Sequence, residues 1–110
     1  MKAKIRRRYL ALKIDSKEKI GQKEFMDAVW EAVLRLYGEY GASKTNLALI
    51  EYNAEHGTAI IRAAHTELDH LRAAIATITE IAAKPAAVHI LTVSGTIKKL
   101  RKKLEYNFKP

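Results

Sequence analysis

The segment Thr92–Leu104, TVSGTIKKLRKKL, runs from a strand-like stretch through a Ser-Gly-Thr turn into a basic helix. Ile97, Leu100 and Leu104 recur at helical spacing and form one apolar stripe. The other faces of this helix carry its cations: Lys98, Lys99, Arg101, Lys102 and Lys103. A helix of this kind can dock by its stripe and hold its cations toward a polyanion.

The positive charge of the chain is concentrated at its two ends. Residues 1–13 contain six Lys or Arg and no acid, and residues 94–110 contain six against one acid. Residues 14–93 contain eight against eleven acids, so the net charge of +8 comes from the ends. Two solvated tails are the simpler interpretation, but interleaved Leu and Ile give both ends the pattern of ordered structure. The distribution favours RNA as a partner.

Length and composition indicate one globular domain that spans residues 1–110. Of the 110 residues, 48% are hydrophobic and 29% are charged, as in globular rather than disordered chains. The absence of cysteine excludes disulfides, thiolate metal sites and cysteine nucleophiles. No apolar run approaches membrane-spanning length, and the N-terminal region is charged too early for a signal peptide. We therefore expect a cytoplasmic protein with no membrane partner.

The pattern of the chain predicts the element order β-α-β-β-α-β-α. Four segments have the alternation or residue types of strands: 6–14, 47–52, 58–63 and 87–93. Two segments have helical periodicity: 22–40, ended by Gly38 and Gly41, and 66–81, opened by a capping box at Thr66–Asp69. The basic helix begins at about residue 95.

This order predicts an α+β fold of the ferredoxin-like kind, which RNA-recognition domains share. Two right-handed βαβ crossovers joined by a hairpin give a four-stranded antiparallel sheet with two helices on one face. The C-terminal helix is an addition to that plan. It either lies across the open face of the sheet or extends outward, and the sequence leaves both options open.

The sequence gives little support for catalysis or metal binding by the chain itself. Its histidines are scattered over a turn, the start of the second helix and a strand: His56, His65, His70 and His89. The loop after the first strand, Asp15–Lys19, lacks the Arg and glycines with which an acylphosphatase holds its anion. We predict no catalytic residue, metal ligand or protein-bound cofactor.

The first helix carries more apolar residues than one packing face requires. Its apolar stripe includes Tyr37, while Trp30 and Leu34 widen the stripe and Tyr40 follows. They either belong to the core or meet a neighbour, which would be the last helix or a second chain. The sequence does not separate these options.

Four short motifs follow one another along the chain at spacings that resemble a known family. They are Arg7–Leu10 (RRYL), Ala28–Arg35 (AVWEAVLR) followed by Gly38, Gly57–Arg62 (GTAIIR) and Val93–Leu100 (VSGTIKKL). Together they resemble the archaeal ribonuclease P protein component 2 family, which is related to a small eukaryotic RNase P/MRP subunit. The resemblance runs from about residue 6 to 104, and the order of the motifs carries it more than any single one.

The resemblance implies a non-catalytic subunit of ribonuclease P, in which the RNA, served by Mg²⁺, removes 5′ leaders from precursor tRNA. It also implies a larger TIM-barrel-like protein partner and self-association in a heterotetramer with two copies of each protein. We expect the RNA contacts at the two basic clusters: Arg6, Arg7, Arg8, Ser94, Thr96, Lys98, Lys99, Arg101, Lys102 and Lys103. The turn Ser94–Thr96 is also expected to cap the last helix.

The alternative function is a stand-alone RNA-recognition module that binds single strands. Such modules stack bases on aromatic residues of the central strands. Here Tyr9 is the only such candidate on the first strand, and residues 58–63 contain none. The apolar outer positions of the third strand instead favour a face covered by the last helix or by a partner. Membrane association through the basic helix is disfavoured, because its apolar stripe is narrow and lacks Trp.

Overall fold

A computed structural model of the chain describes the backbone of residues 6–108 and the side chains of residues 6–104. Lys2 and Lys4, which contribute to the basic N-terminal end, lie outside the described residues. The main elements are β1 (Arg7–Asp15), α1 (Gln22–Lys44), β2 (Ala48–Asn53), β3 (Thr58–Ala64), α2 (Leu68–Ala76), β6 (Ala87–Ser94) and α3 (Ile97–Phe108). A two-stranded hairpin formed by β4 (Glu80–Ile81) and β5 (Lys84–Pro85) lies between α2 and β6.

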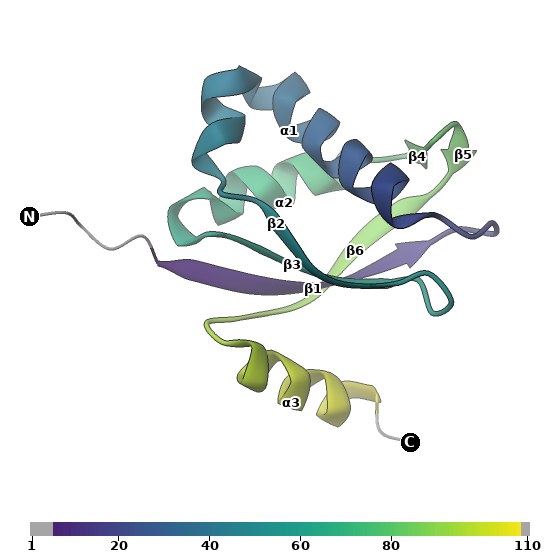
Figure 1. Cartoon of the computed structure of the whole chain (residues 1–110), viewed down its shortest axis with the longest axis vertical. Coiled ribbons are helices and arrows are strands. Elements are labelled where there is room, and N and C mark those ends of the chain that lie inside the picture. Colours follow the sequence, from purple (N-terminus) through teal and green to yellow (C-terminus); the bar gives the residue numbers. More distant parts are fainter. Residues whose placement is uncertain (1–5, 109–110) are drawn as a thin grey trace, which may run out of the picture.

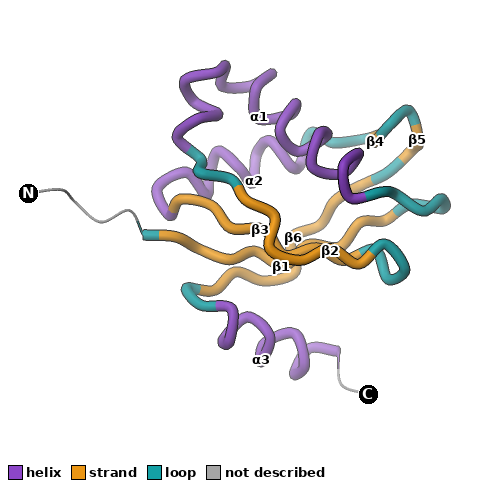
Figure 2. The backbone as a smooth tube through the Cα atoms, in the orientation of Figure 1, coloured by secondary structure: helices purple, strands orange, loops and turns teal. Residues whose placement is uncertain are grey.

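The main sheet has the order β2-β3-β1-β6, and every pair of neighbouring strands is antiparallel. Helices α1 and α2 lie on one face of this sheet and α3 on the other (Figure 1). The predicted ferredoxin-like α+β fold is therefore confirmed. The strands form the middle layer between the two helical layers (Figure 2). None of the helices in the described part of the chain is long and apolar enough to cross a membrane.

The larger core lies between the sheet and the helices α1 and α2. Alternation in β1 directs Leu10, Leu12 and Ile14 toward these helices, and all three are buried. Phe25 of α1 and Leu71 of α2 meet them and are fully buried. Burial of one such side chain contributes roughly 1.5–3 kcal/mol, so this core is the main source of stability.

Helix α1 continues beyond its predicted end near Gly38. Gly38 has a non-helical backbone with φ of 73°, so the helix is kinked there rather than terminated. A final turn follows, in which Ala42 is buried and the hydroxyl of Thr45 donates to the Ala42 carbonyl at 2.7 Å. The glycine marks a change of direction, and the apolar residues beyond it keep the chain packed on the core.

Helix α2 is shorter than the predicted span 66–81. A 3₁₀ turn at His65–Glu67 precedes it, and Glu67 rather than Thr66 occupies its N-cap position, without a side-chain cap bond. The predicted capping box is therefore wrong. The hairpin β4–β5 replaces the last predicted turns, with Ala82 and Ala83 at positive φ. Ile78 and Ile81 are still buried, so the helical spacing of apolar residues continues after the helix itself has ended.

A second, smaller core fixes α3 across the open face of the sheet. Leu100 is fully buried there with Ala11 and Ile60. Two β-bulges enlarge this core, because the unpaired residues Ile50 in β2 and Leu91 in β6 both join it. The sequence left open whether the last helix lies across the sheet or extends outward, and in the structure it lies across the sheet.

Candidate nucleic-acid interface

Arg6, Arg7 and Arg8, just before and at the start of β1, lie at the end of the sheet where β6 turns into α3. The main chain holds the first of them in place, because the His65 N–H donates to the Arg6 carbonyl at 2.7 Å. Arg6 and Arg7 are exposed, and Nη1 of half-buried Arg8 donates to the Arg7 carbonyl at 3.1 Å. A Cβ placed on Gly95 would lie only 3.6 Å from Arg8 Nη1. The structure therefore brings the N-terminal cations to the turn before α3.

The hydroxyls of the turn Ser94–Thr96 shape the start of α3. Thr96 Oγ1 accepts a hydrogen bond from the Lys99 N–H at 3.1 Å, as an N-cap residue does. Ser94 is buried, and its Oγ accepts a long bond of 3.5 Å from the Thr96 N–H. The predicted capping role is confirmed. The predicted RNA contacts of Ser94 and Thr96 stay predictions.

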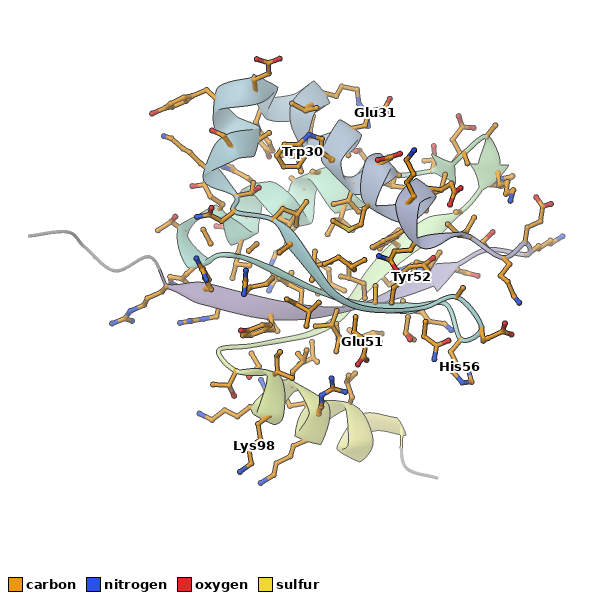
Figure 3. All side chains as sticks on the ribbon, viewed as in Figure 1. Trp30, Glu31, Glu51, Tyr52, His56 and Lys98 are labelled. Carbon is orange, nitrogen blue, oxygen red and sulfur yellow. The ribbon has the colours of Figure 1, made fainter. Side chains whose placement is uncertain are left out.

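The five cations of α3 fall into two sets. Arg101 Nη2 pairs with Glu51 Oε1 of β2 at 2.9 Å, and Lys103 Nζ donates to the Val93 carbonyl at 2.9 Å. These two side chains bind the helix to both edge strands of the sheet. Lys98, Lys99 and Lys102 are exposed, and none forms an ion pair with the residues that the structure describes. Figure 3 shows Lys98 on the side of α3 that faces away from the sheet.

One row of the sheet connects these basic elements. Ala48, Arg62, Tyr9 and Ser94 are partners in register across all four strands, and the row ends at the turn into α3. We call the cations gathered around this end of the sheet the basic end: Arg6, Arg7, Arg8, Arg62, Lys98 and Lys99. The sequence prediction did not include Arg62, because it stands alone in β3. Arg62 is two residues beyond Ile60, which packs against α3, so strand alternation could have placed Arg62 on the α3 side of the sheet.

At the opposite end of the sheet, two of the lysines are bound by acceptors of the chain itself. Lys19 pairs with Glu55 at 2.5 Å, and Lys13 Nζ donates to the His56 carbonyl at 2.5 Å. The hydrogen bond and the charge of Lys19 lower the pKa of Glu55. The hydroxyl of Tyr52 donates to the Ile20 carbonyl at 2.6 Å, and burial together with the charge of Glu24 raises the pKa of Tyr52. Packing and pairing explain both shifts.

The histidines and carboxylates of the described part of the chain do not form a metal centre. No group of three or more potential ligands is placed to hold a metal ion among these residues. His70 instead binds Glu67, with 3.1 Å between Nδ1 and Oε1, and its ring lies 4.4 Å from that of Tyr37. Asp27 and Glu31 line an open groove of about 530 Å³ between α1 and the β4–β5 hairpin.

Helix α1 exposes several large apolar side chains. Trp30 is 40% exposed, whereas the other two predicted interface residues, Leu34 and Tyr37, are half-buried against the larger core. Leu36 and Tyr40, which are not among the three predicted interface residues, are 43% and 70% exposed. The exposed part of this surface is therefore Trp30, Leu36 and Tyr40, which we call the α1 apolar surface. Trp30 is seen on α1 in Figure 3.

Comparison with known proteins places the chain in a family. The model of the Rpp14/Pop5 family matches residues 8–105, which is nearly the whole of the described chain. The chain belongs to the Rpp14/Pop5 family. Ribonuclease P protein component 2 of Methanococcus maripaludis strain C6 is 36% identical over 98 residues, 89% of this chain and 74% of that protein. The protein of the same name from Pyrococcus abyssi is 36% identical over 104 residues, 93% of this chain and 88% of its relative. The predicted family is thus confirmed.

A solved structure supports the fold of this Rpp14/Pop5 chain. A chain in the cryo-EM structure of yeast ribonuclease MRP superimposes with a TM-score of 0.69 and 21% identity. The superposition covers 99% of this chain and 98% of that chain. The likeness includes the three-layer arrangement, because nearly the whole of both chains is aligned.

The structure of this Rpp14/Pop5 chain also disfavours the stand-alone RNA-recognition module. The sheet face on which such modules stack bases is covered here by α3. Tyr9, the one aromatic candidate on β1, is half-buried against the cluster around Leu100. Bases therefore cannot spread over the centre of this sheet while α3 is docked.

Proposed function

We propose that this chain is a non-catalytic protein subunit of ribonuclease P, which binds the catalytic RNA and supports removal of 5′ leaders from precursor tRNA. Membership of the Rpp14/Pop5 family is the observation that carries this proposal. Relatives named ribonuclease P protein component 2 match most of the chain at about one third identity or more. In this assignment the RNA performs the cleavage, and Mg²⁺ serves the RNA rather than a site in this chain.

The basic end gives the proposal a physical basis. Protein cations bind RNA mainly by neutralising phosphates, which releases counterions and makes the affinity depend steeply on salt. Arg6, Arg7, Lys98 and Lys99 are exposed at this end, and Arg101 nearby already has a carboxylate partner in Glu51. We therefore assign the principal RNA contacts to the arginines of β1 and the first turn of α3, with Lys102 extending them along the helix.

The proposal includes protein partners and a cellular location. We assign the chain to a cytoplasmic complex with a larger TIM-barrel-like subunit and to self-association in a heterotetramer. The α1 apolar surface supports a protein contact, since it lies on the opposite side of the molecule from α3. RNA and protein partners would then occupy different faces.

Reconstitution tests the function. Ribonuclease P is assembled from its RNA and remaining protein subunits with and without this chain, and precursor tRNA cleavage is followed at limiting Mg²⁺. We expect cleavage to fall when the chain is omitted and to be absent when the RNA is omitted. Cleavage that does not change without the chain, or cleavage by the protein subunits alone, would disprove the assignment.

A further inference from the structure

Arg62 differs from the other cations of the basic end in being half-buried in the sheet. Its Nε is covered from solvent and has no hydrogen-bond acceptor among the described residues. No other buried side-chain nitrogen or oxygen of these residues is left without a partner. An unsatisfied buried donor is destabilising, and more so when the group is charged. The terminal nitrogens of this guanidinium are not among the buried unpaired atoms of the described residues, so they are the groups that an acceptor from outside can reach.

The position of Arg62 tells where such an acceptor would lie. Alternation places its side chain on the α3 side of the sheet, two residues beyond Ile60. Leu100 of α3 covers Ile60, but the row of Ala48, Arg62, Tyr9 and Ser94 lies nearer the end of the sheet. Arg62 is thus in a central strand, directly beside Tyr9. Only β1 lies between it and β6, the strand that turns into α3.

The charges near Arg62 favour an anion. Arg7 is in the neighbouring strand, opposite Ala64 of β3, and alternation places it on the same side of the sheet as Arg62. Glu51 of β2 faces the same side of the sheet but is bound to Arg101. A guanidinium presents planar N–H groups that match two oxygens of a phosphate, which a lysine ammonium cannot do.

We propose that Arg62 binds an RNA phosphodiester at the end of the sheet face that α3 leaves open, with the Tyr9 ring as one wall of this phosphate subsite. The phosphate oxygens meet the terminal Nη groups of Arg62, because Nε is covered from solvent. The subsite rests on the proposed RNA-binding function and extends it from surface cations to a buried one. The RNA backbone then passes from the arginines of β1 over Arg62 to the first turn of α3.

Substitutions at Arg62 test the subsite in the full chain with ribonuclease P RNA. Arg62→Met keeps the apolar stem and removes the donors, and Arg62→Lys keeps the charge without the fork. The matched control is Arg72→Met, which removes one exposed charge from α2 on the opposite face. Dissociation constants are measured over a salt series, and thermal unfolding of each variant is recorded.

We expect Arg62→Met to weaken binding about 10-fold and to lower the slope of log K against log salt by about 0.7 to 0.9. Arg62→Lys is expected to keep the slope but to bind more weakly than the native chain, and Arg72→Met to bind as the native chain does. If Arg62→Met is poorly folded, the affinity of Arg62→Lys tests the proposal, and native-like binding by this variant would contradict it. A purely structural role would change the melting temperature and leave the affinity and slope of the folded variants as they were, which would overturn the proposal.

The same titration separates the subsite from the proposed function. The variant Lys98→Gln/Lys99→Gln removes exposed cations of the basic end that do not touch Arg62. If it weakens binding while both Arg62 variants bind like the native chain, the subsite is disproved and the function stands. If all variants bind like the native chain, or if the native chain shows no salt-dependent binding, both are disproved.

Discussion

Tyr52 illustrates how one polar atom ties a loop to the sheet. Its ring packs on Phe25 with 5.3 Å between the ring centres, and its hydroxyl donates to the Ile20 carbonyl at 2.6 Å. The loop before α1 is thereby fixed to β2. Burial of the hydroxyl, together with the negative charge of Glu24 nearby, raises the pKa of Tyr52 in the folded state.

The raised pKa gives Tyr52 a pH-dependent effect on stability. Below about pH 10, the usual pKa of tyrosine, Tyr52 is neutral in both states and the native chain should be more stable than Tyr52→Phe by about 1 kcal/mol. Above that pH the unfolded state ionises first, so the advantage should decrease until the folded state ionises too. Urea unfolding of both proteins from pH 8 to 11 measures the difference. A constant difference across this range would contradict the assigned cause.

At the scale of elements, α3 combines docking and presentation of charge. Its apolar stripe places Leu100 in the smaller core, while Arg101 and Lys103 reach Glu51 and the Val93 carbonyl. Lys98 and Lys99 occupy the first turn and are exposed. The sequence alone does not distinguish the bound cations of α3 from the exposed ones. The difference arises because the edge strands β2 and β6 supply acceptors to Arg101 and Lys103 only.

Two double variants of equal charge change separate these roles. Lys98→Gln/Lys99→Gln should leave the free energy of unfolding within about 0.5 kcal/mol but reduce the salt slope of RNA binding by about 1.4 to 1.8 for two lost contacts. Arg101→Gln/Lys103→Gln should lower stability by about 1 kcal/mol, since it removes an exposed ion pair and one hydrogen bond. Its salt slope should fall less. Equal slopes for the two variants would show that the docked cations bind RNA as well as the exposed ones do.

The elements that the sequence predicts well are those with one clearly buried face. Leu10, Leu12 and Ile14 alternate because β1 is covered by helices on one side, and that pattern locates the strand to within a residue. The end of α2 was mispredicted because Ile78 and Ile81 remain at helical spacing after the backbone has turned into a hairpin. A hydrophobic pattern indicates which residues are buried, and here the buried residues continue where the backbone changes from helix to hairpin.

The candidate site was predictable where charge is clustered in sequence and not where folding creates the cluster. Arg6–Arg8 and the lysines of α3 are visible as runs. Arg62 joins them only because β3 pairs with β1, a contact between residues more than fifty positions apart. The bulged residues Ile50 and Leu91, which dock α3, depend on strand pairing in the same way. Local periodicity does not contain this information.

At the scale of the whole molecule, the three layers give the protein two unlike outer surfaces. The α3 side carries the basic end, and the α1 side carries the α1 apolar surface. Tyr40 is the most exposed member of that surface, with Lys44 Nζ 4.4 Å from its ring centre. Exposed aromatic side chains are enriched at protein interfaces, where a few of them supply much of the binding energy.

Removal of the aromatic part of that surface should impair protein assembly and spare RNA binding. Trp30→Ala/Tyr40→Ala takes away two partly exposed rings, so stability should change less than for core truncation, which costs about 3–5 kcal/mol for an aromatic residue. Sedimentation with the larger ribonuclease P protein should then show loss of the complex, whereas Lys17→Ala in the exposed loop after β1 should retain it. The salt slope of RNA binding should match that of the native chain, because no cation of the basic end is altered. Retained assembly together with weakened RNA binding would reverse the assignment of the two faces, since the layered fold keeps α1 and α3 on opposite sides of the sheet.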